Sequence, residues 1–194
     1  RVALKERAAR VAVAHPFNAT QLREVTLGFE LGLYRFDDLK TPSTDMPRAE
    51  VEELTLMSSA DVVSVEEAEA AMKRAATLAS AVNLGRTLVN EPPNICTPQR
   101  LADVAREMTS QPNVGVKVLG RDEVEALGMG GLIAVSQGAT REPQFIHVHY
   151  RPEAPQGALA LIGKGLTFDS GGLSLKPPKS QEEMHIDMGG AAAV

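Results

Sequence analysis

Four side chains that could hold metal ions and catalyse hydrolysis lie close together in the sequence. They are Lys164, Asp169, Lys176 and Asp187, within the glycine-rich segment Gly163–Gly190. Carboxylates are hard oxygen donors that bind divalent cations, and a fixed ammonium group can stabilise an oxyanion as it forms. Two aspartates and two lysines in one short segment therefore predict a metal-assisted hydrolytic site.

A glycine-rich segment after an apolar run can also be a nucleotide-binding loop, but this one fits that pattern poorly. A phosphate-binding loop is disfavoured because five residues separate Gly157 from Gly163 where four are needed, and Gly165 replaces the required Ser or Thr after Lys164. The dinucleotide pattern GxGxxG also lacks its last glycine. On local grounds alone, both lysines could still be solvated surface residues and Asp187 could be a helix cap.

An apolar run, Ala158–Ile162, directly precedes the candidate site. A short, continuous apolar segment of this kind predicts a strand that is buried on both faces of a sheet. Open α/β sheets place their functional groups beyond the carboxyl ends of such strands. The sequence therefore predicts that Lys164 follows the end of a core strand.

Strands and helices are expected to alternate along the rest of the chain. Further strands are predicted at Val11–Ala14, Val51–Met57, Val114–Leu119, Gly131–Ser136 and Gln144–Tyr150. Helices are predicted at Thr20–Lys40, from Ser64 to about Asn90, from Thr97 to about Ser110, and at Asp122–Leu127. Capping signals support the helix starts: Asn18 or Thr20 for the first, the Ser64–Glu67 capping box for the second, and Thr97 with Pro98 for the third. This alternation predicts an α/β fold.

Composition and net charge limit which partners and which cellular location are expected for the protein. The 194 residues carry a net charge of −5, which disfavours a nucleic-acid or anionic-membrane surface. The sequence shows no bilayer-spanning apolar stretch and no secretory signal. Its single cysteine, Cys96, excludes an intrachain disulfide, favours a cytoplasmic location and is expected to be a buried, inert thiol. Arg1 and the helix-like end Gly189–Val194 suggest an internal segment of a longer protein.

The segment Gly163–Gly190 resembles the signature region of the leucyl aminopeptidase family, which are two-metal cytosolic exopeptidases. The resemblance rests on three matching stretches, Gly163–Gly172, Ser174–Pro177 and Met184–Val194, with weaker matches at Asn90–Asn94 and Val135–Gly138. It implies that residues 1–62 end an N-terminal α/β domain and that 63–92 form a linker helix. Residues 93–194 would begin a mixed-sheet α/β catalytic domain.

The resemblance also assigns roles to the candidate residues. Lys164 is similar to the family's amine ligand of the tighter metal, Asp169 to the carboxylate that bridges both metals, and Asp187 to a further ligand of the tighter metal. Lys176 resembles the catalytic lysine that binds the scissile carbonyl oxygen without ligating metal. Met184 occupies a position that lines the pocket for the N-terminal side chain, although ordinary core packing is the alternative.

The sequence also departs from the family pattern. His185 stands where relatives commonly carry lysine, and it is expected to face away from the metals. His147 and His149 would share one face of a strand, for which a polar sheet face is the favoured interpretation over a metal site. The family's second ligand segment, Asn-Thr-Asp-Ala-Glu-Gly-Arg, does not occur in these 194 residues. It supplies another aspartate, a glutamate and the catalytic arginine.

The predicted function is that of a cytoplasmic, metal-dependent aminopeptidase that releases apolar, leucine-like N-terminal residues from peptides. The resemblance implies two divalent ions per subunit, Mn²⁺ or Zn²⁺, and a homohexamer. The alternative is a non-catalytic or DNA-binding member of the same fold. The net negative charge and the intact set of aspartates and lysines favour the enzyme.

Overall fold

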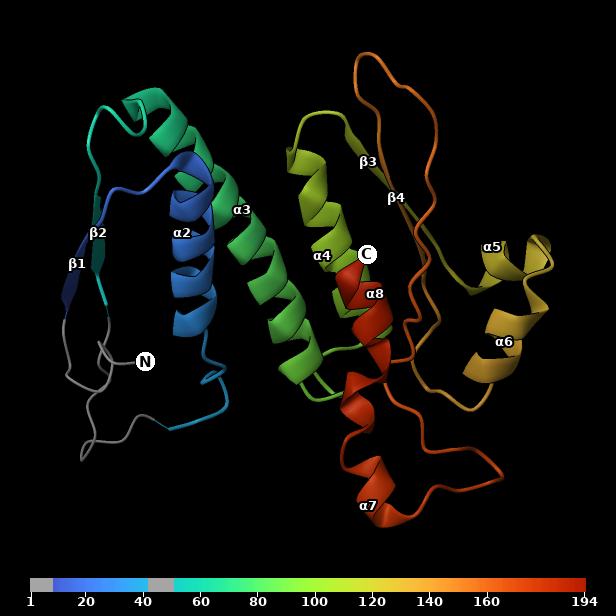
Figure 1. The fold of residues 1–194 in the computed structure, drawn as a ribbon. Helices are drawn as coiled ribbons and strands as arrows, with labels where there is room; N and C mark the ends of the chain where they lie inside the picture. The colour runs from blue at the N-terminus through green and yellow to red at the C-terminus, as the bar shows by residue number, and fades with distance from the viewer. Residues whose placement is uncertain (1–8, 42–50) are drawn as a thin grey trace. The chain divides into compact units, whose positions relative to one another are not determined.

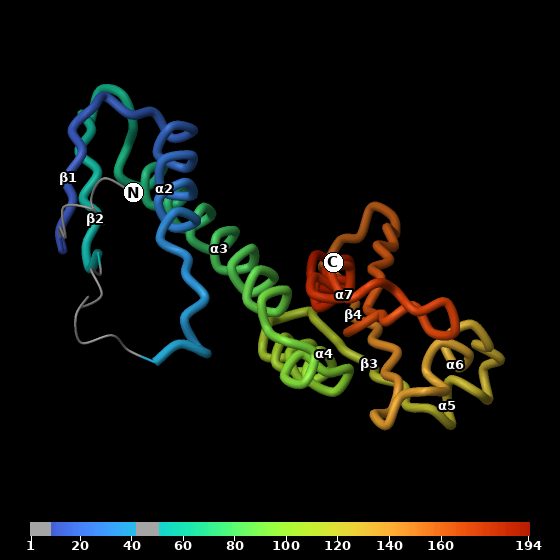
Figure 2. The backbone as a smooth tube through the Cα atoms, turned by 90° about the horizontal axis from the view of Figure 1, so that it is seen from below, coloured from blue at the N-terminus to red at the C-terminus, as the bar shows by residue number. Residues whose placement is uncertain are grey.

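The computed structural model describes residues 9–41 and 51–194 and has a mixed α/β architecture, as predicted (Figure 1). The chain divides into two compact units, Arg1–Leu84 and Gly85–Val194. Figure 2 follows the backbone through both units and shows the helix α3 (Val65–Asn90) as one continuous element. The candidate site belongs wholly to the second unit.

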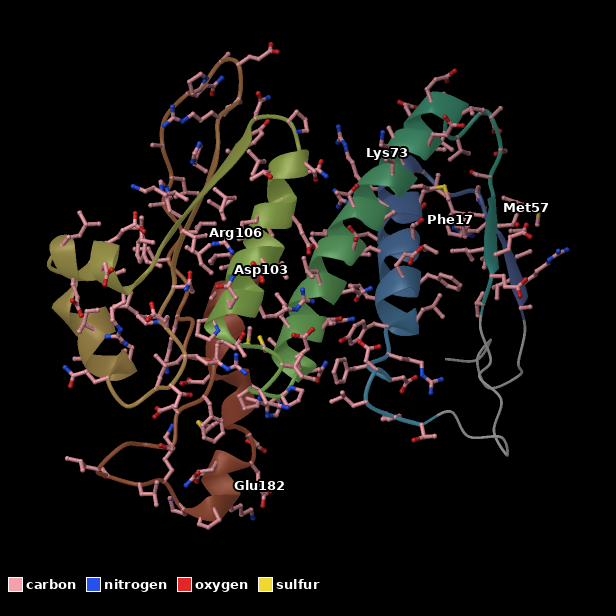
Figure 3. All side chains as sticks on the ribbon, turned by 180° about the vertical axis from the view of Figure 1, so that it is seen from behind. Phe17, Met57, Lys73, Asp103, Arg106 and Glu182 are labelled. Atoms are coloured by element: carbon pink, nitrogen blue, oxygen red, sulfur yellow. The ribbon has the colours of Figure 1, made fainter. Side chains whose placement is uncertain are left out.

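The first unit pairs two short parallel strands with helices. Strand β1 (Arg10–Ala14) and strand β2 (Glu53–Met57) form the pair, which confirms both predicted strands. Helix α2 (Ala19–Leu33) begins with a capping box in which Asn18 and Gln21 each accept a hydrogen bond from the other's backbone N–H. These elements meet in a small apolar cluster of Phe17, Leu22, Val63 and Ala71. Phe17 is labelled in Figure 3.

Helix α2 ends at Leu33, although the apolar pattern predicted that it would continue to Lys40. The backbone leaves the helical region at Tyr34, where ψ is 132°. Beyond it, the Asp37 carboxylate forms ion pairs with Arg35 and Lys40, with N–O distances of 2.9 and 3.1 Å. The Asp37 backbone carbonyl also accepts a hydrogen bond from the Lys40 N–H. These local interactions stabilise a turn in place of the last helical turns.

The second unit is built around one antiparallel strand pair. Strand β3 (Val114–Leu119) runs antiparallel to β4 (Phe145–Tyr150), and α4 (Pro98–Glu107) lies before them with Thr97 as its N-cap. Its apolar core consists of Leu88, Cys96, Leu101, Val104 and Met188, with Ile146 of β4 packed against it. A 3₁₀ turn, η1 (Met108–Ser110), and a short helix, α5 (Arg121–Ala126), complete this part of the unit.

The strand predicted at Gly131–Ser136 is wrong, because these residues form helix α6 (Gly130–Ser136). The carbonyl of Met129 accepts hydrogen bonds from the N–H groups of Leu132 and Ile133, which starts a helical turn. Short apolar runs do not distinguish a strand from a helix by periodicity. Here the local hydrogen bonds decide in favour of the helix.

The buried strand predicted at Ala158–Ile162 is also wrong. Residues 151–170 contain neither helix nor strand, and the side chains of Leu159 and Ile162 are 85% and 94% exposed. No strand of the described residues pairs with this segment. A strand is stabilised by hydrogen bonds to a neighbouring strand, and this segment has no such neighbour among the described residues.

Three short helical pieces follow Lys176 in the chain, and one of them carries Met184 and Asp187. They are α7 (Pro178–Gln181), the 3₁₀ helix η2 (Met184–Met188) and α8 (Gly189–Ala193). Met188 is fully buried in the core of the second unit, so it anchors η2 there. None of the helices in the described part of the chain is long and apolar enough to cross a lipid bilayer.

Candidate active site

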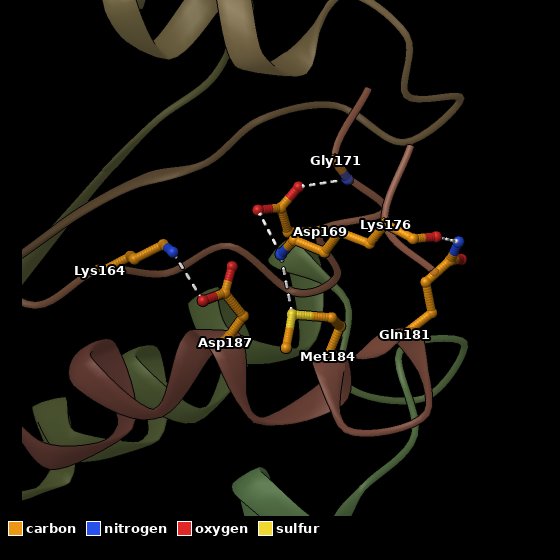
Figure 4. Close-up of polar contacts among 7 residues, drawn as sticks. All are labelled: Lys164, Asp169, Gly171, Lys176, Gln181, Met184 and Asp187. Carbon is orange, nitrogen blue, oxygen red and sulfur yellow. Dashed lines mark hydrogen bonds and ion pairs between the residues drawn. The ribbon is translucent and has the colours of Figure 1, made fainter. Parts of the chain in front are cut away.

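The four polar residues predicted from the sequence lie together and form two ion pairs (Figure 4). Lys164 Nζ lies 2.6 Å from Asp187 Oδ1, and Lys176 Nζ lies 2.9 Å from Asp169 Oδ2. The partners are 23 and 7 residues apart in the chain, so the fold brings the first pair together. Two carboxylates and two amines therefore share one region of the surface.

Contacts of both the side chain and the backbone hold Lys176 in place. Its ammonium group donates to Asp169 and also lies 3.0 Å from the sulfur of Met184. Its backbone N–H donates to the Ser170 carbonyl at 2.8 Å, and its carbonyl accepts from Gln181 Nε2 at 2.7 Å. Gln181 was not predicted as a site residue, because nothing in the residue spacing indicated it.

The carboxylate of Asp169 is held in its charged form. The hydrogen bond from Lys176 lowers its pKa most, and the hydrogen bond from the Gly171 N–H, 2.8 Å from Oδ1, lowers it further. Gly171 has a φ of +93°, and a Cβ there would overlap the Ser174 carbonyl oxygen. Only glycine allows the turn that aims this N–H at Asp169.

Backbone contact between two glycines aligns Lys164 with Asp187. A Cβ on Gly163 would overlap the backbone of Gly190, and the Ala191 N–H donates to the Lys164 carbonyl at 2.8 Å. Residues 163–165 therefore pack directly on the first turn of α8. Asp187 lies in η2 immediately before that helix, within reach of Lys164.

The surroundings of Asp187 fit a bound cation. Its side chain is only 17% exposed, and Oδ2 is buried without a hydrogen-bond partner in the described part of the chain. A buried carboxylate oxygen with no donor is costly, and a cation would satisfy it. Asp187 and Asp169 offer oxygen donors, and the Lys164 amine could join them if it were neutral.

The histidines lie outside this group of contacts. His185 Nδ1 is 3.3 Å from the Glu182 carbonyl oxygen. The rings of His147 and His149 have centroids 5.6 Å apart on β4, on the strand face that the alternation predicted. Residues 9–41 and 51–194 contain no group of three or more His, Cys, Asp or Glu side chains that could hold a metal.

Comparisons with known proteins agree with this picture. The family model described as "Cytosol aminopeptidase family, catalytic domain" matches residues 83–194, which include every residue of the candidate site. A probable cytosol aminopeptidase of Roseiflexus castenholzii is 44% identical over 88% of this chain, and one of Methylorubrum extorquens is 42% identical over 97%. The chain spans 35% and 38% of the lengths of these two relatives.

Solved structures of related enzymes have the same fold. The bottromycin maturation enzyme BotP, in a complex with Mn, matches 97% of this chain and 39% of its own with a TM-score of 0.78 and 32% identity. A mutant of tomato leucine aminopeptidase matches 98% of this chain and 37% of its own, also with a TM-score of 0.78 and at 31% identity. The chain therefore belongs to the cytosol aminopeptidase family.

Proposed function

We propose that the full-length protein is a metal-dependent aminopeptidase that removes apolar, leucine-like residues from the N-termini of peptides. The observation that carries this proposal is the pair of adjacent ion pairs, Lys164–Asp187 and Lys176–Asp169, inside the family's catalytic-domain match. This chain covers about a third of the length of its relatives, so the full-length protein is the one to assay.

Two divalent ions per subunit, Mn²⁺ or Zn²⁺, are part of the proposal. Asp169 would bridge them, and Asp187 and the neutral Lys164 amine would bind one of them. The unpaired Oδ2 of Asp187 and the Mn in the BotP structure support this assignment. Divalent ions in such a site lower the pKa of bound water and polarise a carbonyl group.

Lys176 is the proposed catalytic residue of this chain. Its ammonium group would donate a hydrogen bond to the scissile carbonyl oxygen and stabilise the negative charge that develops there. Its backbone N–H donates to the Ser170 carbonyl and its own carbonyl accepts from Gln181 Nε2, and these two hydrogen bonds fix the position of the backbone that carries the side chain. Met184, whose sulfur touches the same ammonium, would line the pocket for the substrate's N-terminal side chain.

We also infer a homohexamer that acts on peptides in the cytoplasm. The resemblance of residues 163–194 to the family signature supports the assembly. The names of the relatives, cytosol aminopeptidases, support the location. The net charge of −5 gives no support for nucleic acid as a partner.

Hydrolysis assays on the full-length protein test the proposal. The protein is stripped with a chelator and assayed on leucine and glutamate anilides before and after addition of Mn²⁺ or Zn²⁺. We expect metal-dependent release from the leucine substrate and much slower release from the glutamate substrate. Activity that survives complete removal of metal would overturn the metal requirement, and equal rates would overturn the apolar preference.

A further inference from the structure

The catalytic candidate Lys176 touches an oxidisable sulfur. Its Nζ lies 3.0 Å from Met184 Sδ, and this thioether and Asp169 are its two side-chain partners within the described part of the chain (Figure 4). A thioether is a weak hydrogen-bond acceptor, so the contact with Met184 does little by itself to keep the ammonium from a substrate. A stronger acceptor at the same position would compete with the substrate carbonyl for that ammonium.

Oxidation of the Met184 sulfur adds one oxygen atom, which is a stronger hydrogen-bond acceptor than the thioether. The thioether sulfur attacks one oxygen of hydrogen peroxide, an S–O bond forms, the O–O bond breaks, and the departing oxygen leaves as water. The sulfur loses two electrons and the peroxide gains them. The product is a polar sulfoxide whose oxygen accepts hydrogen bonds strongly. Because the sulfur lies 3.0 Å from Nζ, an oxygen added to the sulfur lone pair that faces Nζ would lie beside the ammonium.

We propose that Met184 is a peroxide-sensitive modification site, and that its sulfoxide inhibits the enzyme by holding the ammonium of Lys176 away from the substrate. The loss of activity rests on the proposed aminopeptidase function, whereas the modification and the capture of Lys176 do not. The modification is reversible, because methionine sulfoxide reductases restore the thioether.

Burial sets the expected order of oxidation for three of the seven methionines. Met184 is half-buried, Met57 on β2 is 49% exposed (Figure 3), and Met188 is fully buried four residues after Met184. Met57 and Met184 should therefore be oxidised while Met188 stays reduced. Cys96 should also stay reduced, because it is 1% exposed and burial raises the pKa of its thiol to about 11.

The first experiment maps oxidation and amine reactivity by peptide mass spectrometry. The full-length protein is treated with graded hydrogen peroxide in the presence of chelator and then labelled with acetic anhydride. Sulfoxide should form at Met184 and Met57 before Met188, and labelling of Lys176 should fall relative to the exposed Lys179. Met184 that remains reduced while Met57 is oxidised, or labelling of Lys176 that does not change, would overturn the proposal. This measurement is decisive even if the protein shows no peptidase activity.

The second experiment measures activity after metal is restored, with each variant normalised to its own untreated rate. The kcat of the wild type should fall by at least about tenfold, because complete loss of an oxyanion donor costs about 10²–10³ and the sulfoxide competes for that donor without removing it. Met57→Leu should lose as much, and Met184→Leu should lose little. Reductase should restore the wild type, whereas dithiothreitol alone should not. Equal losses in both variants would refute Met184 as the inhibitory site.

Discussion

At the scale of single residues, the two ion pairs differ in their exposure. In the first pair, the side chains of Lys176 and Asp169 are 29% and 32% exposed. In the second pair, the side chain of Lys164 is 58% exposed and that of Asp187 is 17% exposed. Ion pairs this accessible contribute only about 0–1 kcal/mol to stability. Their arrangement is therefore explained better by chemistry than by folding, and substitutions should affect activity more than the free energy of unfolding.

Substitution of Lys176 should separate catalysis from metal binding. Lys176→Ala in the full-length protein is expected to lower kcat by about 10²–10³, because it removes the donor to the developing oxyanion. Metal content, measured by elemental analysis, should stay unchanged, since Lys176 is not a proposed ligand. Lys179→Ala, on the neighbouring helix α7, is the matched control and should leave both quantities unchanged. Loss of a metal equivalent with Lys176→Ala would make Lys176 a ligand.

The two aspartates should have different effects on metal binding. Asp169→Asn is expected to weaken both metal sites, because a bridging carboxylate contributes to each of them. Asp187→Asn should weaken mainly one site, since it is proposed to bind a single ion. Calorimetric metal titration of both purified variants measures this difference. If each variant lost the same single site, the bridging role of Asp169 would be wrong.

Cys96 should behave as an inert core thiol. Burial raises its pKa to about 11, the charge of Glu91 adds to the effect, and Arg100 opposes it. Alkylation by iodoacetamide at pH 8 should therefore be slow in the folded protein and fast in urea. Above the ordinary pKa of 9.0, the unfolded chain ionises first, so the free energy of unfolding should fall as pH rises toward 11. Rapid alkylation of the folded protein would contradict this burial.

At the scale of elements, the sequence predicted what is stabilised locally. The capping box at Ser64–Glu67 and the Thr97 cap both form, so α3 and α4 begin where their caps indicated. The strand at Ala158–Ile162 was predicted from hydrophobicity alone, but a strand also needs a partner. Caps depend on neighbours three residues away, whereas strand pairing depends on distant segments that a local pattern does not reveal.

The contact between Gly163 and Gly190 provides a test at the same scale. Gly163→Ala should destabilise the packing of residues 163–165 on α8 by about 1–3 kcal/mol, because the new methyl group overlaps backbone atoms. Gly131→Ala in helix α6 is the control, since its Cβ would meet nothing within 4 Å. That substitution should be neutral or stabilising by about 0.4–1 kcal/mol. Urea unfolding of both variants checks the difference, and equal stabilities would mean that the glycine contact is dispensable.

At the scale of the whole molecule, the site belongs to one unit and one family match. Every proposed ligand lies in Gly85–Val194 and within the matched residues 83–194. The motif identified the residue types, but it did not reveal the Lys176–Met184 contact or the hydrogen bond from Gln181. Both depend on how η2 and α7 fold back onto the loop, and no residue spacing encodes that arrangement.

The surface of the second unit leads to a prediction for the 194-residue chain expressed by itself. Leu159 and Ile162, which precede Lys164 in the chain, are 85% and 94% exposed, and Leu173, between Asp169 and Lys176, is fully exposed. Apolar side chains exposed in this number favour association. We expect the isolated chain to elute as aggregates, to bind an apolar dye, and to release no product from a leucine anilide with Mn²⁺ or Zn²⁺. Open coordination by Lys164, Asp169 and Asp187 alone should bind metal weakly. The full-length protein is the control, and a monomeric, cooperatively melting chain with clear turnover would show that these three ligands suffice.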